Sequence, residues 1–181
     1  MDSLVNRAAR ALLAGKTILY PTDTIWGIGC DARNEDAIER IYSIKGRDRS
    51  KSMLVLADCK EWGVPEGDRP TTYILPETIW RPLLGDGIAT NLPAEDGTLG
   101  VRVPNHEFCR QLIHLLGAPI VSTSANFSGQ ATPATYGEIE EELKLCVDYC
   151  VPPLEAFLTG ETRGSRIVKV SADGHQTILR P

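Results

Sequence analysis

Short apolar runs, each about as long as a buried strand, recur along the chain and limit the folds open to it. Between them lie longer segments with the spacing of amphipathic helices. Strands and helices intermix without strict strand–helix–strand alternation, which favours a mixed-sheet α/β domain. The predicted strands cover 17–20, 52–57, 71–75, 98–103, 118–121 and 147–151, with a final hairpin of 165–170 and 176–180 across Asp173 and Gly174.

Helices are predicted where apolar stripes follow residues that commonly cap a helix. The segment from Pro21 to Gly29, rich in polar residues and glycine, is expected to be a turn instead. The predicted helices are 4–14 after Ser3, 35–45 between Asn34 and Gly46, 105–116 opened by Asn105, and 135–145 opened by a capping box of Thr135 and Glu138.

Length and composition place the chain among ordinary globular proteins. Its 181 residues, 42% of them hydrophobic, are enough for one buried core, so a single domain over 1–181 is expected. The net charge of −5 argues against a nucleic-acid binder that works by bulk charge. No signal peptide or membrane-length apolar stretch is evident, and the five cysteines form no C-x-x-C pair, so a cytoplasmic protein without disulfides or zinc is expected.

The common nucleotide-binding and hydrolase motifs are missing. Gly27 and Gly29 form only a G-x-G, and no G-x-x-x-x-G-K-[ST] loop occurs. The three histidines lack metal-ligand spacing, and no G-x-S-x-G elbow is present. A Rossmann, P-loop, zinc or serine-hydrolase mechanism is therefore not indicated.

A cluster of cations stands out between Arg40 and Lys51. This stretch contains five basic residues and one acidic residue, a local charge of +4, so the rest of the chain carries −9. One interpretation is a solvated helix end whose cations complement the helix dipole. The other is a phosphate clamp in which Lys45 and Arg47 converge on one anion. The cluster alone leaves both open.

Two loops of small polar residues have a similar double interpretation. Residues 118–135 pass from an apolar strand into serines, threonines and an asparagine, and residues 21–24 read P-T-D-T. Such side chains either bind a ligand with neutral donors or satisfy their own turns. Asp23 by itself is more typical of an exposed turn aspartate than of an acid–base or metal residue.

Three separated motifs together resemble a known family. "YPTDTIWGIGCDA", "IKGR…KSMLVL" and "GVRVPNH…PIVSTSANFSG" resemble, in order and spacing, the YrdC-like threonylcarbamoyl-AMP synthases over residues 16–181. The family's K-x-R and S-x-N signature corresponds to Lys45, Arg47, Ser124 and Asn126. The resemblance implies a twisted α/β fold with a concave substrate site, in the short form without the C-terminal domain of longer members.

The resemblance also implies a reaction. ATP, bicarbonate and L-threonine, with Mg²⁺ carried on the ATP, would give threonylcarbamoyl-AMP and pyrophosphate for the threonylcarbamoyl-transferase machinery that modifies tRNA. No protein metal site and no membrane partner are expected. The implied catalytic residues are Lys45, Arg47, Ser124 and Asn126; those for ATP are Arg47, Lys51, Thr98, Ser124, Asn126, Thr132 and Arg180; those for threonine are Thr24, Arg102, Ser122 and Ser165.

The chain departs from the family pattern at several positions. Leu56 stands where the family usually has a histidine, Ser52 where a proline follows the lysine, and Arg166 within the usual S-T-V. The segment 58–70 looks short by about one helix. These differences bear on activity more than on fold.

Two other functions remain as alternatives. One is a non-catalytic protein of the same fold that binds nucleotide or double-stranded RNA. The intact S-x-N and the acidic charge disfavour it. The other is a carbamoyl-transferring module of a hydrogenase-maturation protein, which would be expected within a much larger chain. The synthase is the preferred interpretation.

Overall fold

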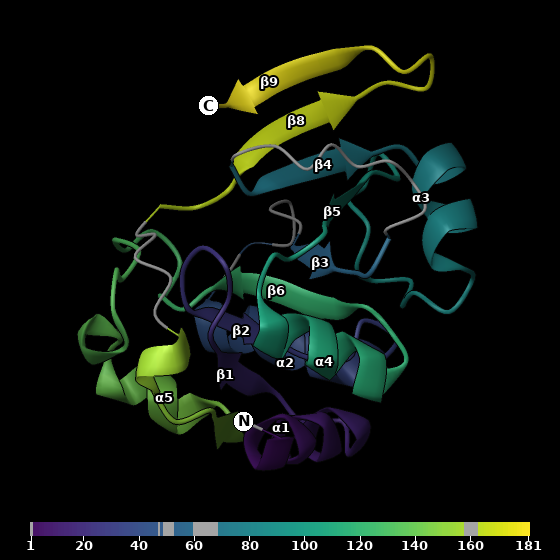
Figure 1. The fold of residues 1–181 in the computed structure, drawn as a ribbon. Coiled ribbons are helices and arrows are strands. Elements are labelled where there is room, and N and C mark those ends of the chain that lie inside the picture. The colour runs from purple at the N-terminus through teal and green to yellow at the C-terminus, as the bar shows by residue number, and fades with distance from the viewer. Residues whose placement is uncertain (1, 47, 49–52, 60–68, 158–162) are drawn as a thin grey trace.

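The computed structural model describes residues 2–46, 48, 53–59, 69–157 and 163–181 (Figure 1). In this part of the chain the strands form one nine-stranded sheet in the order β7-β1-β2-β6-β3-β5-β4-β8-β9. The strands are β1 (Ile18–Tyr20), β2 (Gly27–Gly29), β3 (Leu54–Leu56), β4 (Thr71–Leu75), β5 (Leu99–Arg102), β6 (Ile120–Ser124), β7 (Tyr149–Cys150), β8 (Arg166–Val170) and β9 (Gln176–Arg180).

The sheet contains both parallel and antiparallel pairs of strands. The pairs β1–β7, β3–β5 and β4–β8 are parallel, and the other neighbours are antiparallel. The prediction of a mixed-sheet α/β fold is therefore confirmed, as is the C-terminal hairpin of β8 and β9.

Helices α1 (Asp2–Leu13), α2 (Glu35–Lys45) and α4 (Glu107–Leu116) lie around the part of the sheet that holds β1, β2 and β6 (Figure 1). Helix α3 (Glu77–Leu84) lies beside β4 and β5 instead, and the β8–β9 hairpin projects at the opposite end of the sheet. Within the described residues, no helix combines the length and apolarity that a bilayer-spanning segment needs. The helices are α1 (Asp2–Leu13), α2 (Glu35–Lys45), α3 (Glu77–Leu84), α4 (Glu107–Leu116) and α5 (Glu141–Cys146), with 3₁₀ turns η2 (Tyr136–Glu138) and η3 (Glu155–Phe157).

Helix α2 follows its sequence signals closely. The Asn34 side chain accepts a hydrogen bond from the Ala37 backbone N–H at 2.9 Å, as an N-cap should. Gly46 ends the helix in the left-handed region at φ 55°, which glycine adopts without a steric penalty. These two caps place Lys45 in the last turn, beside the loop that follows β6.

Two polar segments near the middle of the sheet form more strand than the sequence predicted. β6 continues to Ser124, three residues past the predicted strand, and β2 forms where a turn was predicted. The two strands pair antiparallel, with Gly27 opposite Ser124. A Cβ at Gly29 would lie 2.2 Å from the Val121 carbonyl oxygen, so glycine here permits close strand approach rather than a turn.

Other boundaries also need correction. Helix α3 was not predicted, and its Pro82 interrupts the helical pattern. Helix α4 begins after His106 rather than at Asn105. The predicted helix 135–145 is instead η2 followed by α5, and the Thr135 hydroxyl donates to Glu138 Oε1 rather than capping a backbone N–H. The segment thought to lack a helix lies mostly at 60–68, outside the described residues.

Candidate active site

A cleft of about 280 Å³ opens along the middle of the sheet and the C-terminal hairpin. It is lined mainly by hydroxyl side chains and glycines, with apolar residues such as Trp26 and Met53 and two arginines. Seven residues named from the family resemblance lie in its lining: Thr24, Arg102, Ser122, Ser124, Thr132, Ser165 and Arg180. Segments from across the chain thus converge on one concave site.

Strand register explains this convergence. Leu54 of β3 pairs with Ser122 of β6 on one side and with Gly100 of β5 on the other. A Cβ at Gly100 would lie 3.1 Å from the Leu54 Cβ, which is tighter than ordinary contact. Because Gly100 has no side chain, no Cβ fills the cleft between the serines of β6 and the arginine of β5.

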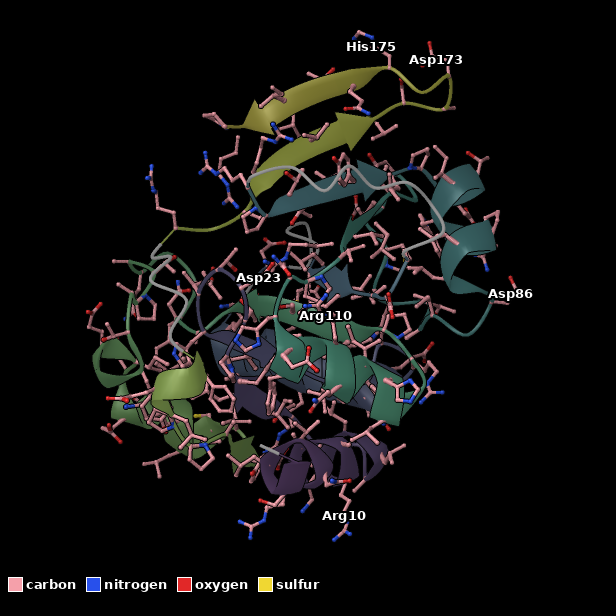
Figure 2. All side chains as sticks on the ribbon, in the orientation of Figure 1. Arg10, Asp23, Asp86, Arg110, Asp173 and His175 are labelled. Atoms are coloured by element: carbon pink, nitrogen blue, oxygen red, sulfur yellow. The ribbon has the colours of Figure 1, made fainter. Side chains whose placement is uncertain are left out.

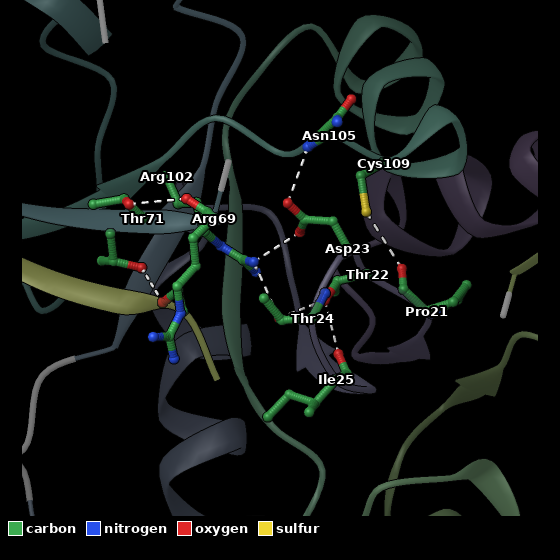
Figure 3. Close-up of polar contacts among 12 residues, drawn as sticks. Pro21, Thr22, Asp23, Thr24, Ile25, Arg69, Thr71, Arg102, Asn105 and Cys109 are labelled. Atoms are coloured by element: carbon green, nitrogen blue, oxygen red, sulfur yellow. Dashed lines mark hydrogen bonds and ion pairs between the residues drawn. The ribbon is translucent and has the colours of Figure 1, made fainter. Parts of the chain in front are cut away.

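The arginine at the base of the cleft is held by a buried carboxylate (Figure 3). Arg102 Nη1 donates to Asp23 Oδ1 at 2.7 Å and to Thr24 Oγ1 at 3.0 Å. The Asn105 backbone N–H donates to the other Asp23 oxygen at 3.0 Å. The two charged side chains are 3% and 5% exposed, so the expectation of an exposed turn aspartate is wrong.

Arg102 keeps a donor for a ligand. Among the described residues, its buried Nε has no hydrogen-bond partner. A buried donor left unpaired is costly, and a guanidinium fork matches the geometry of a carboxylate. Asp23 offsets the charge on one edge of Arg102, and the Nε edge remains suited to a bound anion.

The P-T-D-T turn fixes the hydroxyl of Thr24. Thr22 Oγ1 donates to the Ile25 carbonyl at 2.8 Å, and it accepts from the Thr24 backbone N–H at 3.1 Å. Because that donation uses the one hydroxyl proton of Thr22, the 3.0 Å contact between the two hydroxyls has Thr24 as the donor. Thr24 Oγ1 then acts as an acceptor toward Arg102 and toward any ligand beside it.

Lys45 has a different environment from the one expected. Its side chain is almost fully buried, and Nζ donates to the carbonyls of Ser124 and Asn126 at 2.5 and 2.6 Å. Its own carbonyl accepts from the Ser128 N–H at 2.9 Å. Lys45 therefore ties α2 to the loop after β6 and does not face solvent. A contact with ATP phosphate stays a prediction, and it does not match this placement of the ammonium.

Asn126 organises the same loop. Its amide nitrogen donates to the carbonyls of Phe127 and Gln130 at 2.9 and 3.0 Å. Its Oδ1 is buried and lacks a partner among the described residues. The S-x-N segment is thus fixed by Lys45 from one side and by Asn126 from within.

The wall formed by β4, β8 and β9 contains a residue that sequence reasoning did not single out. Thr72 lines the cleft, and its hydroxyl lies 2.7 Å from the hydroxyl of Ser165. Arg180 donates through Nε and Nη2 to the Ser165 carbonyl at 2.9 and 2.5 Å. The strand pattern of 71–75 could have located Thr72, because Thr72 and Ile74 share one face of β4.

The remaining predicted residues lie elsewhere. The Thr98 hydroxyl donates to Asp96 at 2.6 Å and is not part of the cleft lining, so its contact with ATP stays a prediction. Leu56 is fully buried in β3, where it pairs with Arg102 of β5. Arg47 and Lys51 lie outside the described residues.

The site offers no strong nucleophile and no metal cage in the described part of the chain. Burial raises the pKa of the Cys109 and Cys30 thiols, which keeps them protonated. No group of three histidine, cysteine or carboxylate side chains is placed to hold a metal in the described ranges. Asp23 is already bonded to the Arg102 side chain and the Asn105 backbone N–H.

Comparisons with known proteins agree with this geometry. The family model Sua5_yciO_yrdC, described as "Telomere recombination", matches residues 10–181. The threonylcarbamoyl-AMP synthase of Pseudoalteromonas translucida is 32% identical over 176 residues, covering 92% of this chain and 92% of its own length.

Solved structures show the same fold. The P. abyssi Sua5 structure complexed with L-threonine is 25% identical with a TM-score of 0.77; the match covers 98% of this chain and 53% of that one, so this chain spans about half its length. E. coli YciO is 24% identical with a TM-score of 0.71, covering 99% and 89%. On the family model and on these relatives, the chain belongs to the Sua5/YciO/YrdC family.

Proposed function

We propose that this protein is a threonylcarbamoyl-AMP synthase. The observation that carries the proposal is the buried Arg102, which lines a hydroxyl-rich cleft and whose Nε has no hydrogen-bond partner among the described residues. This is a group suited to an amino-acid carboxylate. Relatives at about 30% identity bear the synthase name, and one solved relative is complexed with L-threonine.

In this proposal the two substrates share the cleft. The threonine carboxylate binds Arg102, with Thr24, Ser122 and Ser165 around the rest of the amino acid. The nucleotide lies toward Ser124, Thr132 and Arg180, and Arg47 and Lys51 are expected to join its phosphates. The loop after β6 then separates the amino-acid end from the nucleotide end.

The chemistry needs positioning more than covalent catalysis. The threonine amine adds to bicarbonate, with loss of water, and forms a carbamate. A carbamate oxygen then attacks the α-phosphorus of ATP, and pyrophosphate leaves with the electron pair of the broken P–O bond. No enzyme nucleophile takes part, so protonated thiols are compatible with the reaction. In-line alignment and fixed donors would supply most of the rate.

Magnesium enters the proposal only as an ion carried by ATP. The described side chains do not form a protein ligand set for it, and Asp23 is occupied. Phosphate oxygens are the usual ligands of Mg²⁺ in such sites. Transfer of the product to the threonylcarbamoyl-transferase machinery acting on tRNA, and a cytoplasmic location, are also part of the proposal.

A non-catalytic nucleotide- or RNA-binding protein is less well supported. Such a protein would not require a buried arginine with an unpaired donor beside an ordered S-x-N loop. The acidic net charge also disfavours electrostatic RNA binding.

An assay by mass spectrometry tests the function. Pure protein incubated with ATP, Mg²⁺, L-threonine and bicarbonate is expected to form threonylcarbamoyl-AMP, and omission of any one of these is expected to abolish it. The threonine carboxylate and amine are both used, so threonine amide should be a poor substrate. ATP binding without any product would contradict the synthase proposal and favour the non-catalytic alternative.

A Ser124→Ala variant tests the β6 end of the cleft. Its hydroxyl lines the cleft, whereas its carbonyl makes the Lys45 contact, so the substitution leaves that contact in place. We expect product formation to fall roughly a hundredfold to a thousandfold, as loss of one donor to developing charge does, with the melting temperature unchanged. Thr123→Ser, one position along β6, is the matched control. A wild-type rate for Ser124→Ala would remove this hydroxyl from the mechanism.

A further inference from the structure

Two buried hydroxyl side chains form a pair on the cleft wall made by β4 and the start of β8. Thr72 and Ser165 line the cleft, are 3% and 5% exposed, and have their hydroxyl oxygens 2.7 Å apart. Among the described residues, neither hydroxyl has another hydrogen-bond partner. Each hydroxyl supplies one proton and two lone pairs, and the contact between them uses only one of the two protons. The pair therefore keeps one donor, together with free lone pairs, for a ligand in the cleft.

Ser165 is fixed in this wall from two sides. Arg180 Nε donates to the Ser165 carbonyl at 2.9 Å, and Thr72 contacts the Ser165 hydroxyl. Ser165 directly precedes β8, at the end of the hairpin away from the tip, where Figure 2 labels Asp173 and His175. The base of the hairpin, rather than its tip, thus contributes to the cleft.

An apolar notch, the space above Gly100 between Leu54 and Thr72, lies beside this pair. The φ of Gly100 is outside the left-handed region, so the backbone conformation does not require glycine here. A Cβ would lie 3.1 Å from the Leu54 Cβ and 3.5 Å from the Thr72 Cγ2. Because Gly100 lines the cleft, the space that a side chain would take is open to a ligand. Thr72 thus turns its methyl group toward the notch and its hydroxyl toward Ser165, an arrangement that its β-branched side chain keeps stiffly.

The notch and the hydroxyl pair lie next to the proposed ligand of the threonine carboxylate. Gly100 and Arg102 are two positions apart on β5, so they share its cleft face at a spacing of about 7 Å. Tyr73 pairs antiparallel with Val101, which puts Thr72 on the Arg102 side of that pair. An amino acid bound through its carboxylate at Arg102 would therefore have its side chain within reach of Thr72 and Gly100.

We propose that Thr72 and Gly100 set the side-chain specificity of the cleft, for an amino acid that carries a hydroxyl and a methyl group on its β-carbon. The ligand methyl group lies over Gly100, against Leu54 and the Thr72 methyl, and the ligand hydroxyl bonds to Ser165. Thr72 is a positioning residue for that bond, because it orients the Ser165 hydroxyl. The inference rests on the proposed function, in which L-threonine is the substrate, and it concerns two residues to which the family resemblance assigned no role.

Calorimetric titration with L-threonine, L-serine and L-2-aminobutyrate tests this assignment, since serine lacks the methyl group and 2-aminobutyrate lacks the hydroxyl. Thr72→Val keeps the shape of the side chain and removes its hydroxyl. We expect it to weaken binding of threonine and serine roughly fivefold to tenfold, and that of 2-aminobutyrate by less than about twofold. Gly100→Ala fills the notch. We expect it to weaken binding of threonine and 2-aminobutyrate roughly tenfold, and that of serine by less than about twofold.

Thr71→Val is the matched control, because the same change is made one position along β4 on the opposite face. The Thr71 hydroxyl donates to the Arg69 carbonyl, as Figure 3 shows, and Thr71 is not part of the cleft lining. Its affinities for the same amino acids are expected to stay within about twofold of the wild-type values. Thermal unfolding of each variant checks the fold, and if Gly100→Ala does not fold, the affinity ratios of Thr72→Val decide the proposal.

The outcomes separate this assignment from the proposed function. Equal weakening of every ligand by Thr72→Val, unchanged affinities, or a wild-type protein that does not prefer threonine over serine and 2-aminobutyrate would overturn the assignment. Formation of threonylcarbamoyl-AMP by such a protein would leave the proposed function in place. A protein that shows the expected binding pattern but makes no threonylcarbamoyl-AMP contradicts the proposed function while the assignment stands.

Discussion

An Arg102→Met variant is expected to lose threonine-dependent product formation and to unfold more readily than the wild type. The substitution removes the proposed carboxylate ligand, for which we expect a drop in kcat/KM for threonine on the order of 100-fold or more. It also leaves the Asp23 carboxylate, whose side chain is 5% exposed, without its cationic partner. Leaving such a charge unpaired costs about 3–5 kcal/mol of unfolding free energy. Steady-state kinetics measures kcat/KM for threonine, and urea denaturation measures the free energy of unfolding.

A second variant separates the two effects. In Asp23→Asn, Arg102→Met the stranded charge is gone, and the new amide oxygen can still accept from the Asn105 N–H. We expect most of the unfolding free energy to return while activity stays lost. If the double variant recovered threonine-dependent activity together with stability, Arg102 would be a structural residue and the carboxylate would bind elsewhere.

Local signals predicted those parts of the fold that local interactions determine. Asn34 and Gly46 delimit α2 through their own backbone and side-chain bonds, so neighbouring residues were sufficient to place its ends. The β8–β9 hairpin likewise depends on a short turn, in which Gly174 has φ 85°. Helix α3 was not predicted because Pro82 interrupts its helical pattern. Its buried Trp80 donates through Nε1 to the Gly97 carbonyl, a tertiary contact that the local sequence does not indicate.

Features that depend on distant partners could not be predicted from the residues alone. Gly29 was interpreted as part of a turn, and only the approach of Val121 at close range explains it as a strand residue. Asp23 and Arg102 are 79 residues apart in sequence, and neither carries a local sign of the ion pair. Most candidate site residues came from the family resemblance, and the structure brings seven of them to one cleft.

A Lys45→Met variant is expected to destabilise the loop after β6. The methionine keeps an unbranched side chain but leaves the carbonyls of Ser124 and Asn126 without their donor. Buried acceptors that lose their donor cost about 1–3 kcal/mol each, so for these two carbonyls we expect a loss of about 2–6 kcal/mol in unfolding free energy. Amide hydrogen exchange at Asn126 and Gln130 should quicken, since both lie in the loop that Lys45 holds. Arg40→Gln, an exposed cation on the same helix, should cost less than about 1 kcal/mol.

The kinetics and amide exchange of Lys45 variants distinguish the two interpretations of the K-x-R motif. If the lysine positions the loop, Lys45→Met lowers kcat and speeds amide exchange, and Lys45→Arg restores part of both, because a guanidinium can still donate to two carbonyls. If instead the ammonium moves to phosphate when nucleotide binds, the same variant raises the KM for ATP, and in the nucleotide-bound protein it does not quicken loop exchange. The second pattern would show that Lys45 leaves Ser124 and Asn126 when nucleotide binds. The first would make the S-x-N loop a unit that is assembled before any substrate arrives, with phosphate recognition left to Arg47, Lys51 and Arg180.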